Sequence, residues 1–329
     1  MGGAVGDALG APVEFMSRTE ILDTFGSDGI TRYVPAYGVL GAITDDTQMT
    51  LFTAEGLLEA RSGAHDRGFI TEAERCISMA YLDWLTTQGE SPQHFRPHLH
   101  PGSFLLRQAQ LHNRRAPGGT CLSALRDLTA LGEPASNDSK GCGGVMRVAP
   151  IGLVPWLDDD ETFALGTSAA GLTHGHPTGK LTGGVLATLI RTAIQGGTIP
   201  EGLDKARHYL KAAPGHHETL RAIEQAQALA ASNLSPSEAI ARMGEGWVAE
   251  EALAISIYCA LVARDFREGI VLAVNHDGDS DSTGAITGNI LGALWGLESI
   301  PTEWLEPLEL HDAIRHVADD LYKSGNWSG

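Results

Sequence analysis

Two acidic clusters, far apart in the chain, carry the residue types that are best suited to chemistry. One is Thr44-Asp45-Asp46-Thr47, and the other is Gly278-Asp279-Ser280-Asp281-Ser282-Thr283. Carboxylate and hydroxyl oxygens are the ligands that Mg²⁺ and Mn²⁺ prefer. Taken alone, each cluster also fits an acidic, capped turn at a helix start, with Thr44 as one N-cap and Asp281, Ser282 or Thr283 as the other. Both clusters combine two carboxylates with a hydroxyl at a predicted helix start. This likeness favours the interpretation that each cluster supplies half of the ligands of one metal site.

A further acidic residue, Glu14, lies between the apolar residues Val13 and Phe15. Glutamate is rarely buried without a partner. Glu14 is therefore either a half-exposed surface residue or part of a site, and its neighbours leave both interpretations open.

A glycine-rich run, residues 139–143, precedes a stretch that is expected to be helical. Backbone N–H groups at such a helix start can stabilise an anion. The run is neither a Walker sequence nor a dinucleotide-binding fingerprint, and a capped turn is the alternative interpretation.

Histidines occur in two places that bear on function. His174 and His176 follow a predicted helix over 158–172, where the helix dipole would favour their protonated forms. His94, His98 and His100 have metal-like spacing, but no carboxylate or cysteine lies near them, so we interpret them as loop residues rather than zinc ligands.

The helices that position these acidic residues are marked by glycines at every fourth position. These glycines occur at 2, 6 and 10 and again at 284, 288, 292 and 296. This spacing puts the glycines on one helical face, where another helix can approach closely, so the later helix is expected to be central and buried. Pro12 is expected to end the first helix near Gly10 and to place Glu14 just beyond it. This helix starts without a cap, which favours a short segment before Met1.

The remaining apolar spacing is helical, and no alternating strand pattern competes with it. The predicted fold is all-α, and the absence of linkers or low-complexity blocks predicts one domain over residues 1–329. The other predicted helices cover residues 44–60, 71–87, 102–115, 120–131, 181–194, 203–213, 218–231, 236–243, 250–263, 266–274 and 308–322.

Bulk composition excludes several functional classes. The net charge of −18 and the pI near 5.0 argue against nucleic acid or an anionic membrane as a partner, because both would be repelled. The four cysteines are scattered, which fits reduced thiols. There is no signal-like start and no run of 18 apolar residues, so we expect a cytoplasmic protein. An acidic, patch-poor helical domain suggests a monomer.

Five motifs taken together resemble the ADP-ribosylglycohydrolase family, which includes the dinitrogenase reductase-activating glycohydrolase and the ADP-ribosylarginine and ADP-ribosylserine hydrolases. They occur in the family's order and span residues 2 to about 297. The resemblance implies a compact, orthogonally packed all-α domain that holds two Mg²⁺ or Mn²⁺ ions at the mouth of an ADP-ribose cleft. The motifs are Gly3-Ala-Val-Gly-Asp-Ala-Leu-Gly-Ala-Pro-Val-Glu14, Thr44-Asp-Asp-Thr47, Gly141-Cys-Gly-Gly-Val-Met-Arg147, Thr173-His174 and Gly278-Asp-Ser-Asp-Ser-Thr-Gly-Ala285.

The resemblance also implies roles for individual residues. The implied metal ligands are Thr44, Asp45, Asp46, Asp279, Asp281 and Ser282. The implied catalytic residues are Glu14, Asp46 and Asp279. The implied substrate-binding residues are Ser139, Lys140, Gly141, Cys142, Gly143 and His174.

Two departures accompany the resemblance. Ser282 stands where several relatives carry threonine, and Cys142 stands where many carry asparagine, which puts one side-chain hydrogen bond to the ligand in question. Counting charge supports a metal site, because the five carboxylates of Glu14 and the two acidic clusters sum to −5 and two divalent ions would supply +4.

The resulting hypothesis is a metal-dependent hydrolase. It would cleave the glycosidic bond at ribose C1″ and remove ADP-ribose from a protein side chain, preferably arginine, or from a small-molecule conjugate. Its metals would fix ribose hydroxyls and activate a water, and Glu14 or an aspartate would take the proton. The alternatives are a catalytically silent ADP-ribose-binding or structural protein of the same fold, and a two-metal phosphohydrolase.

Overall fold

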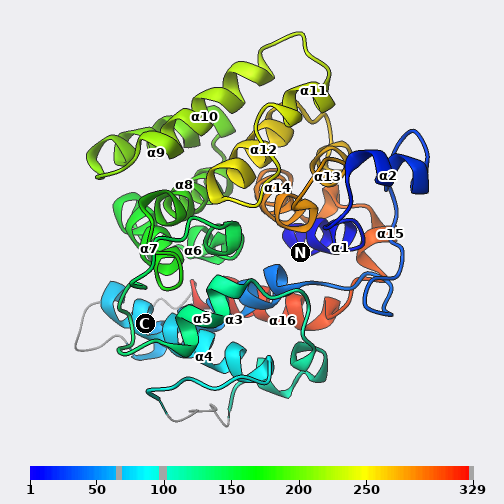
Figure 1. Cartoon of the computed structure of the whole chain (residues 1–329). Coiled ribbons are helices and arrows are strands. Elements are labelled where there is room, and N and C mark those ends of the chain that lie inside the picture. The colour runs from blue at the N-terminus through cyan, green and yellow to red at the C-terminus, as the bar shows by residue number, and fades with distance from the viewer. Residues whose placement is uncertain (64–68, 96–101, 326–329) are drawn as a thin grey trace.

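The computed structural model describes residues 1–63, 69–95 and 102–325, and within these ranges the protein is α-helical with no β-strand (Figure 1). The all-α prediction is therefore confirmed. His98 and His100 lie outside the described residues. The helices are α1 (Gly2–Gly10), α2 (Arg18–Phe25), α3 (Asp45–Gly63), α4 (Phe69–Thr87), α5 (Gly119–Arg126), α6 (Ala149–Leu153), α7 (Asp159–Gly171), α8 (Pro177–Ile194), α9 (Ile199–Ala212), α10 (His217–Ala230), α11 (Pro236–Ala241), α12 (Ala249–Val262), α13 (Phe266–Val274), α14 (Ser280–Trp295), α15 (Thr302–Leu305) and α16 (His311–Ser324).

Helices α1 and α14 pack against each other through their glycines. A Cβ atom added to Gly6 would lie 2.0 Å from the Gly284 carbonyl oxygen, and one added to Gly288 would lie 2.1 Å from the Gly2 carbonyl oxygen. The two backbones can approach this closely only because the side chains are missing. Gly296 does not belong to this face: it ends α14 with a φ of 76°, a left-handed value that glycine adopts without cost.

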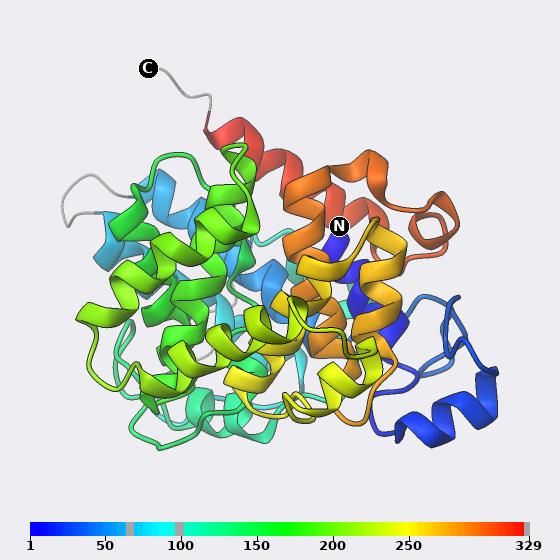
Figure 2. The same cartoon turned by 90° about the horizontal axis from the view of Figure 1, so that it is seen from above.

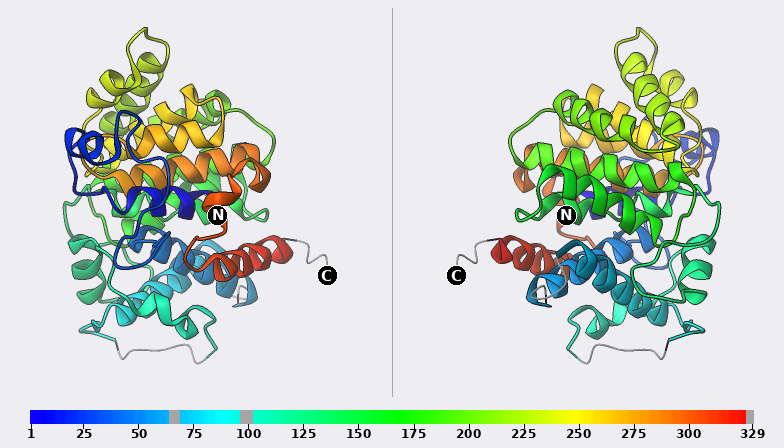
Figure 3. Two further views of the ribbon diagram at one scale, coloured as in Figure 1. Left: turned by 90° about the vertical axis from the view of Figure 1, so that its right-hand side faces the viewer. Right: turned by 90° about the vertical axis from the view of Figure 1, so that its left-hand side faces the viewer.

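The α1–α14 pair lies in the middle of the molecule. Figures 1 and 3 show α10, α11 and α12 on one side of the pair and α3, α4, α5 and α16 on the other. Seen from above, α7 to α9 lie on the left, and α13, α14 and the small α2 lie on the right (Figure 2). The α1–α14 pair is therefore enclosed by helices from both the first and the second half of the chain.

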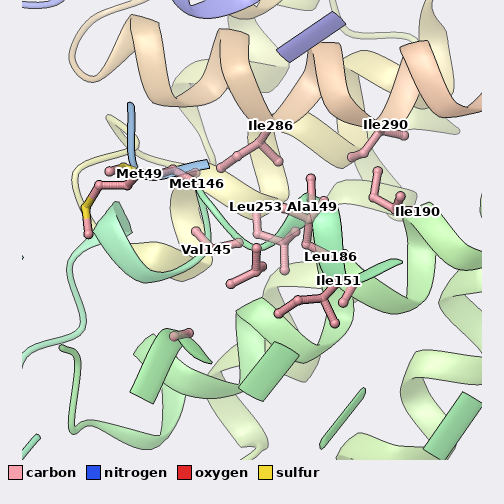
Figure 4. Close-up of a cluster of buried hydrophobic side chains, with 14 of the residues drawn as sticks. Met49, Val145, Met146, Ala149, Ile151, Leu186, Ile190, Leu253, Ile286 and Ile290 are labelled. Atoms are coloured by element: carbon pink, nitrogen blue, oxygen red, sulfur yellow. The ribbon is translucent and has the colours of Figure 1, made fainter. Parts of the chain in front are cut away.

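A buried apolar cluster joins the helices that carry the candidate site (Figure 4). Met49 of α3, Leu186 of α8, Leu253 of α12 and Ile286 of α14 are each fully buried in it. Burying one such side chain contributes about 1.5–3 kcal/mol, so the cluster fixes these helices relative to one another.

The structure corrects several predicted boundaries. Residues 102–115 form no α-helix; they contain two short 3₁₀ turns, Leu105–Arg107 and Ala109–His112, separated by the extended Gln108. The helix α2 was not predicted, although Ser17 and Glu20 form a capping box at its start. No helix in the described part of the chain is both long and apolar enough to cross a membrane.

Candidate functional site

A pocket of about 290 Å³ opens where the end of α1, the starts of α3 and α14 and the glycine-rich run meet. Its lining combines carboxylates, glycines and aromatic rings. The lining residues are Glu14, Phe15, Asp45, Asp46, Ala116, Gly118, Gly119, Thr120, Cys121, Gly141, Cys142, Gly143, Met146, His174, Trp247, Asp279, Asp281 and Ser282.

A buried carboxylate in α1 positions the start of α3. Asp7 accepts hydrogen bonds from the backbone N–H groups of Thr44, at 3.0 and 3.1 Å, and Thr47, at 3.1 Å. It also accepts one from the Thr47 hydroxyl. These N–H groups have no partner within the helix, so Asp7 caps α3 from a different helix. Asp45 and Asp46 follow in the first turn, and Asp45 accepts from the Gly118 N–H at 3.2 Å.

The start of α14 is capped by its own acidic cluster. Asp279 is the N-cap residue, rather than one of the predicted residues 281–283, and its side chain accepts from the Ser282 N–H. The Ser282 N–H also lies 2.9 Å from the Asp281 carboxylate. The Cys142 thiol donates to Asp279 at 2.8 Å, and burial raises the pKa of this thiol well above its usual range, so it stays a donor.

The two acidic clusters come together although they are far apart in the sequence. The Ser282 hydroxyl lies 3.4 Å from a carboxylate oxygen of Asp46, and the Thr44 side chain hydrogen-bonds Asp281. Each of these four residues is buried. The starts of α3 and α14 therefore form one continuous acidic surface at the pocket.

Glu14 lies beside this surface and is buried, with 6% of the residue exposed. Its Oε2 atom has no hydrogen-bond partner among the described residues. Burial, and then the charge of Asp281, raises the pKa of Glu14 to about 10. The interpretation of Glu14 as a half-exposed surface residue is wrong.

The other carboxylates in the pocket show the same behaviour. Burial raises the pKa of Asp45, Asp46 and Asp279 well above the usual range, and the charge of Asp281 adds to the effect in each case. Burial also raises the pKa of Asp7, to about 7. This group of acids is therefore strongly self-repelling when ionised.

The chemistry of these side chains fits hard divalent cations. The donors are oxygens, and Glu14 Oε2 and Asp46 Oδ1 are buried with no partner in the described structure. As the side chains stand, no group of three or more His, Cys, Asp or Glu among the described residues is arranged to hold a metal ion. In this arrangement Asp46 contacts the Ser282 hydroxyl, and Asp279 accepts from the Cys142 thiol.

The glycine-rich run also lines the pocket. Cys142 donates its N–H to the Trp247 carbonyl, and Ala249 donates to the Lys140 carbonyl, which holds the run against the start of α12. Gly141, Cys142 and Gly143 line the pocket.

Two of the predicted substrate-binding residues in this run, Ser139 and Lys140, are not among the residues that line the pocket. The Ser139 hydroxyl contacts the Thr120 hydroxyl at 3.1 Å. The ammonium group of Lys140 pairs with Glu218 at 3.1 Å and with Glu250. Lys140 therefore links the run to α10 and α12.

His174 lines the pocket and is 1% exposed. Burial, and then the positive charge of Arg147, lowers its pKa to about 3. The expectation that the helix dipole would favour protonated His174 is therefore wrong, because loss of hydration outweighs the dipole.

The sequence analysis did not identify several residues that the structure places at the site. Phe15 and Trp247 stack at the pocket with ring centroids 5.8 Å apart, and they are 73% and 39% exposed. Exposed aromatic residues in two distant segments give no sign that they are neighbours. Asp7 and Arg147 both lie within the quoted motifs, but the sequence does not reveal that they contact Thr44 and Thr173.

Comparisons with known proteins show which family the chain is similar to. A family model described as ADP-ribosylglycohydrolase matches residues 1–329. The ADP-ribosyl-[dinitrogen reductase] glycohydrolase of Rhodospirillum rubrum is 26% identical, over 98% of this chain and 93% of that protein. The ADP-ribosylarginine hydrolase Tri1 of Serratia proteamaculans is 25% identical, over 98% and 77%. A solved structure described as an ADP-ribosylglycohydrolase-related protein complex matches with a TM-score of 0.71 and 29% identity, over 98% and 95%.

Proposed function

This chain belongs to the ADP-ribosylglycohydrolase family, whose members hydrolyse glycosyl bonds, and we propose that it removes ADP-ribose from modified arginine side chains of proteins. The observation that carries the proposal is the meeting of the two acidic helix starts, in which Ser282 contacts Asp46 beside the buried Glu14. Small molecules that carry ADP-ribose through the same type of glycosidic bond are included in the proposed substrate class.

We assign the divalent-cation ligands to the oxygens of the two helix starts. They are Thr44, Asp45, Asp46, Asp279, Asp281 and Ser282, and two Mg²⁺ or Mn²⁺ ions would offset four of the five negative charges that these residues carry together with Glu14. When bound, such ions orient ribose hydroxyls and make a nearby water more acidic.

The chain's own residues supply the remaining parts of the reaction. Neutralising the charges of Asp279 and Asp281 would lower the pKa of Glu14 by removing its electrostatic part, although burial, the larger cause, would remain. We assign Glu14, in its ionised form, as the group that accepts a proton from the attacking water. The oxygen of this water bonds to ribose C1″ as the bond from C1″ to the acceptor nitrogen breaks. The nitrogen keeps the electron pair of that bond and takes up the proton that Glu14 accepted, so that arginine and free ADP-ribose are released. Carboxylates around the ring stabilise the positive charge that develops there.

The stacked pair Phe15 and Trp247 supports arginine as the acceptor. Both rings line the pocket and are partly open to solvent. A guanidinium group stacks well on aromatic faces, and it can do so while it is still joined to the ribose.

Release of free ADP-ribose tests the function. In the presence of Mg²⁺, we expect the wild type to release it from an ADP-ribosylarginine peptide and the double variant Asp46→Asn/Asp279→Asn to do so at least about 100 times more slowly. Asp277→Asn is the matched control, because Asp277 is exposed and only caps α2 through the Arg18 N–H. Wild-type turnover by the double variant would rule the proposal out.

Peptides that carry ADP-ribose on arginine or on serine, together with a nucleobase conjugate, identify the acceptor bond. We expect the fastest release from arginine. Faster release from serine would retain the hydrolase but overturn the assignment of its acceptor, and release of inorganic phosphate would indicate a phosphohydrolase.

A further inference from the structure

Arg147 is a fully buried cation that has no carboxylate partner among the described residues. Its guanidinium lies over the Tyr81 ring, with 4.3 Å between Cζ and the ring centroid. One nitrogen, Nη2, donates to the Ala169 carbonyl at 3.1 Å and to the Thr173 hydroxyl at 2.7 Å. A buried charge held only by neutral groups is costly, which points to a specific use.

The Thr173 hydroxyl connects Arg147 to the pocket. Its oxygen accepts from Arg147 and lies 2.8 Å from Nδ1 of His174. Arginine is always a donor, so the hydroxyl is free to direct its single proton elsewhere. The Cys121 sulfur also lies near this hydroxyl, but sulfur is a weak acceptor compared with an imidazole nitrogen. The proton therefore goes to Nδ1.

This arrangement determines the protonation of the imidazole ring. A neutral histidine carries one N–H, so an acceptor at Nδ1 places the hydrogen on Nε2. Burial and Arg147 keep the ring neutral by lowering its pKa to about 3. Nε2 has no hydrogen-bond partner in the described part of the chain, and it lies against the glycine-rich run, 3.3 Å from where a Cβ of Gly141 would be.

We propose that Arg147 is a positioning residue that acts through the Thr173 hydroxyl to fix His174 as the Nε2–H tautomer, so that the ring donates a hydrogen bond to a phosphate or ribose oxygen in the pocket. The tautomer follows from the contacts within the protein, whereas the identity of the acceptor as ADP-ribose rests on the proposed function. The glycines at 141 and 143 leave space for this ring, since a Cβ at Gly143 would lie 3.1 Å from Cε1 of His174.

Nitrogen NMR of ¹⁵N-histidine-labelled, ligand-free protein at pH 7 tests the tautomer, because protonated and unprotonated ring nitrogens resonate far apart. We expect the wild type to show His174 protonated at Nε2, with the assignment given by loss of its signal in His174→Asn. Thr173→Val removes the hydroxyl with little change in volume and should give a mixture of tautomers. Thr173→Ser should restore the single Nε2–H form.

Calorimetric titration with ADP-ribose then tests the consequence for binding. We expect about 10-fold weaker binding by Thr173→Val and near-wild-type affinity for Thr173→Ser. A wild-type signal from Nδ1–H, or an unchanged tautomer in Thr173→Val, would overturn the proposal. If the wild type shows Nε2–H but does not bind ADP-ribose, the proposed function fails while the tautomer assignment stands.

Discussion

At the scale of the residue, burial of His174 has a measurable effect on stability. Its folded pKa of about 3 lies below the value of an exposed histidine, so the unfolded chain takes up a proton first as the pH falls. The contribution of His174 to stability is therefore complete above about pH 6.5 and is lost as the pH falls toward 3. Between pH 8 and pH 5 this loss amounts to about 2 kcal/mol.

The variant His174→Asn isolates this effect from that of the other titratable groups. The amide oxygen of asparagine can accept the Thr173 hydrogen bond in place of Nδ1, but the side chain does not titrate. Urea unfolding of both proteins should show a decline between pH 8 and pH 5 that is larger in the wild type by about 2 kcal/mol. Equal declines in both proteins would contradict the burial of a neutral ring.

The sequence predicted the acidic residues of the site better than the residues that support them. The two clusters could be recognised because carboxylates and hydroxyls recur in both, and the structure brings Asp46 and Ser282 together. Asp7 could not be recognised in the same way. It is a single acid in an apolar helix, and its role arises only from packing against Thr44.

At the scale of the element, the α1–α14 contact predicts two opposite outcomes for two glycines. Gly6→Ala would place a Cβ 2.0 Å from the Gly284 carbonyl oxygen, which forces the helices apart and should destabilise the protein by about 3 kcal/mol. Gly292→Ala is the matched control, because its nearest contact is 3.4 Å away and alanine favours a helix by up to about 1 kcal/mol.

Thermal and urea unfolding of the two variants check this prediction. A large loss of stability in Gly6→Ala, with little change or a gain in Gly292→Ala, is the expected result. Similar stabilities for the two variants would show that the helices do not approach as closely as the structure describes.

The ion pairs of Lys140 make a second prediction at this scale. Lys140→Met should weaken ADP-ribose binding about five-fold, because the glycine-rich run loses its link to Glu218 and Glu250. Lys205→Met is the control, since Lys205 pairs with Asp159 on a similarly exposed surface. Calorimetric titration with ADP-ribose distinguishes the two variants, and an equal effect of both would exclude the anchoring role.

Helices were predictable where periodicity and close packing act together. Glycine at every fourth position predicted that each of these two helices has a face for close packing, because so many glycines in a helix need a packing reason. The sequence did not show that α1 and α14 pack against each other. The predicted helix over residues 102–115 is wrong, although its apolar residues have helical spacing. Gln108 is extended, and the chain forms two short 3₁₀ turns instead. Periodicity reports which side chains are buried, but it does not report whether the backbone hydrogen bonds continue.

At the scale of the whole molecule, the acidic site couples cation binding to pH. An acid whose pKa is raised by folding contributes stability below its unfolded pKa, and this stability is lost as the pH rises toward the folded pKa. Asp7, with a pKa of about 7, and Glu14, with a pKa of about 10, both behave in this way. Divalent cations should offset this loss, so we expect Mg²⁺ to raise the Tm more at pH 8 than at pH 5.5.

Thermal scans with and without Mg²⁺ at the two pH values provide the check. The Asp46→Asn/Asp279→Asn variant should respond weakly at both values, whereas Asp277→Asn should behave as the wild type does. A Tm increase that is independent of pH would mean that the cation does not compete with protons for these carboxylates.

Counting bound Mn²⁺ by electron paramagnetic resonance tests the central claim most directly, namely that the starts of α3 and α14 together hold a pair of divalent ions. We predict two Mn²⁺ ions per chain in the wild type and in Asp277→Asn, with the magnetic coupling expected of neighbouring ions. We predict loss of this coupled pair in Asp46→Asn/Asp279→Asn. A wild type that binds no Mn²⁺, or a double variant that binds the same coupled pair, would contradict the claim.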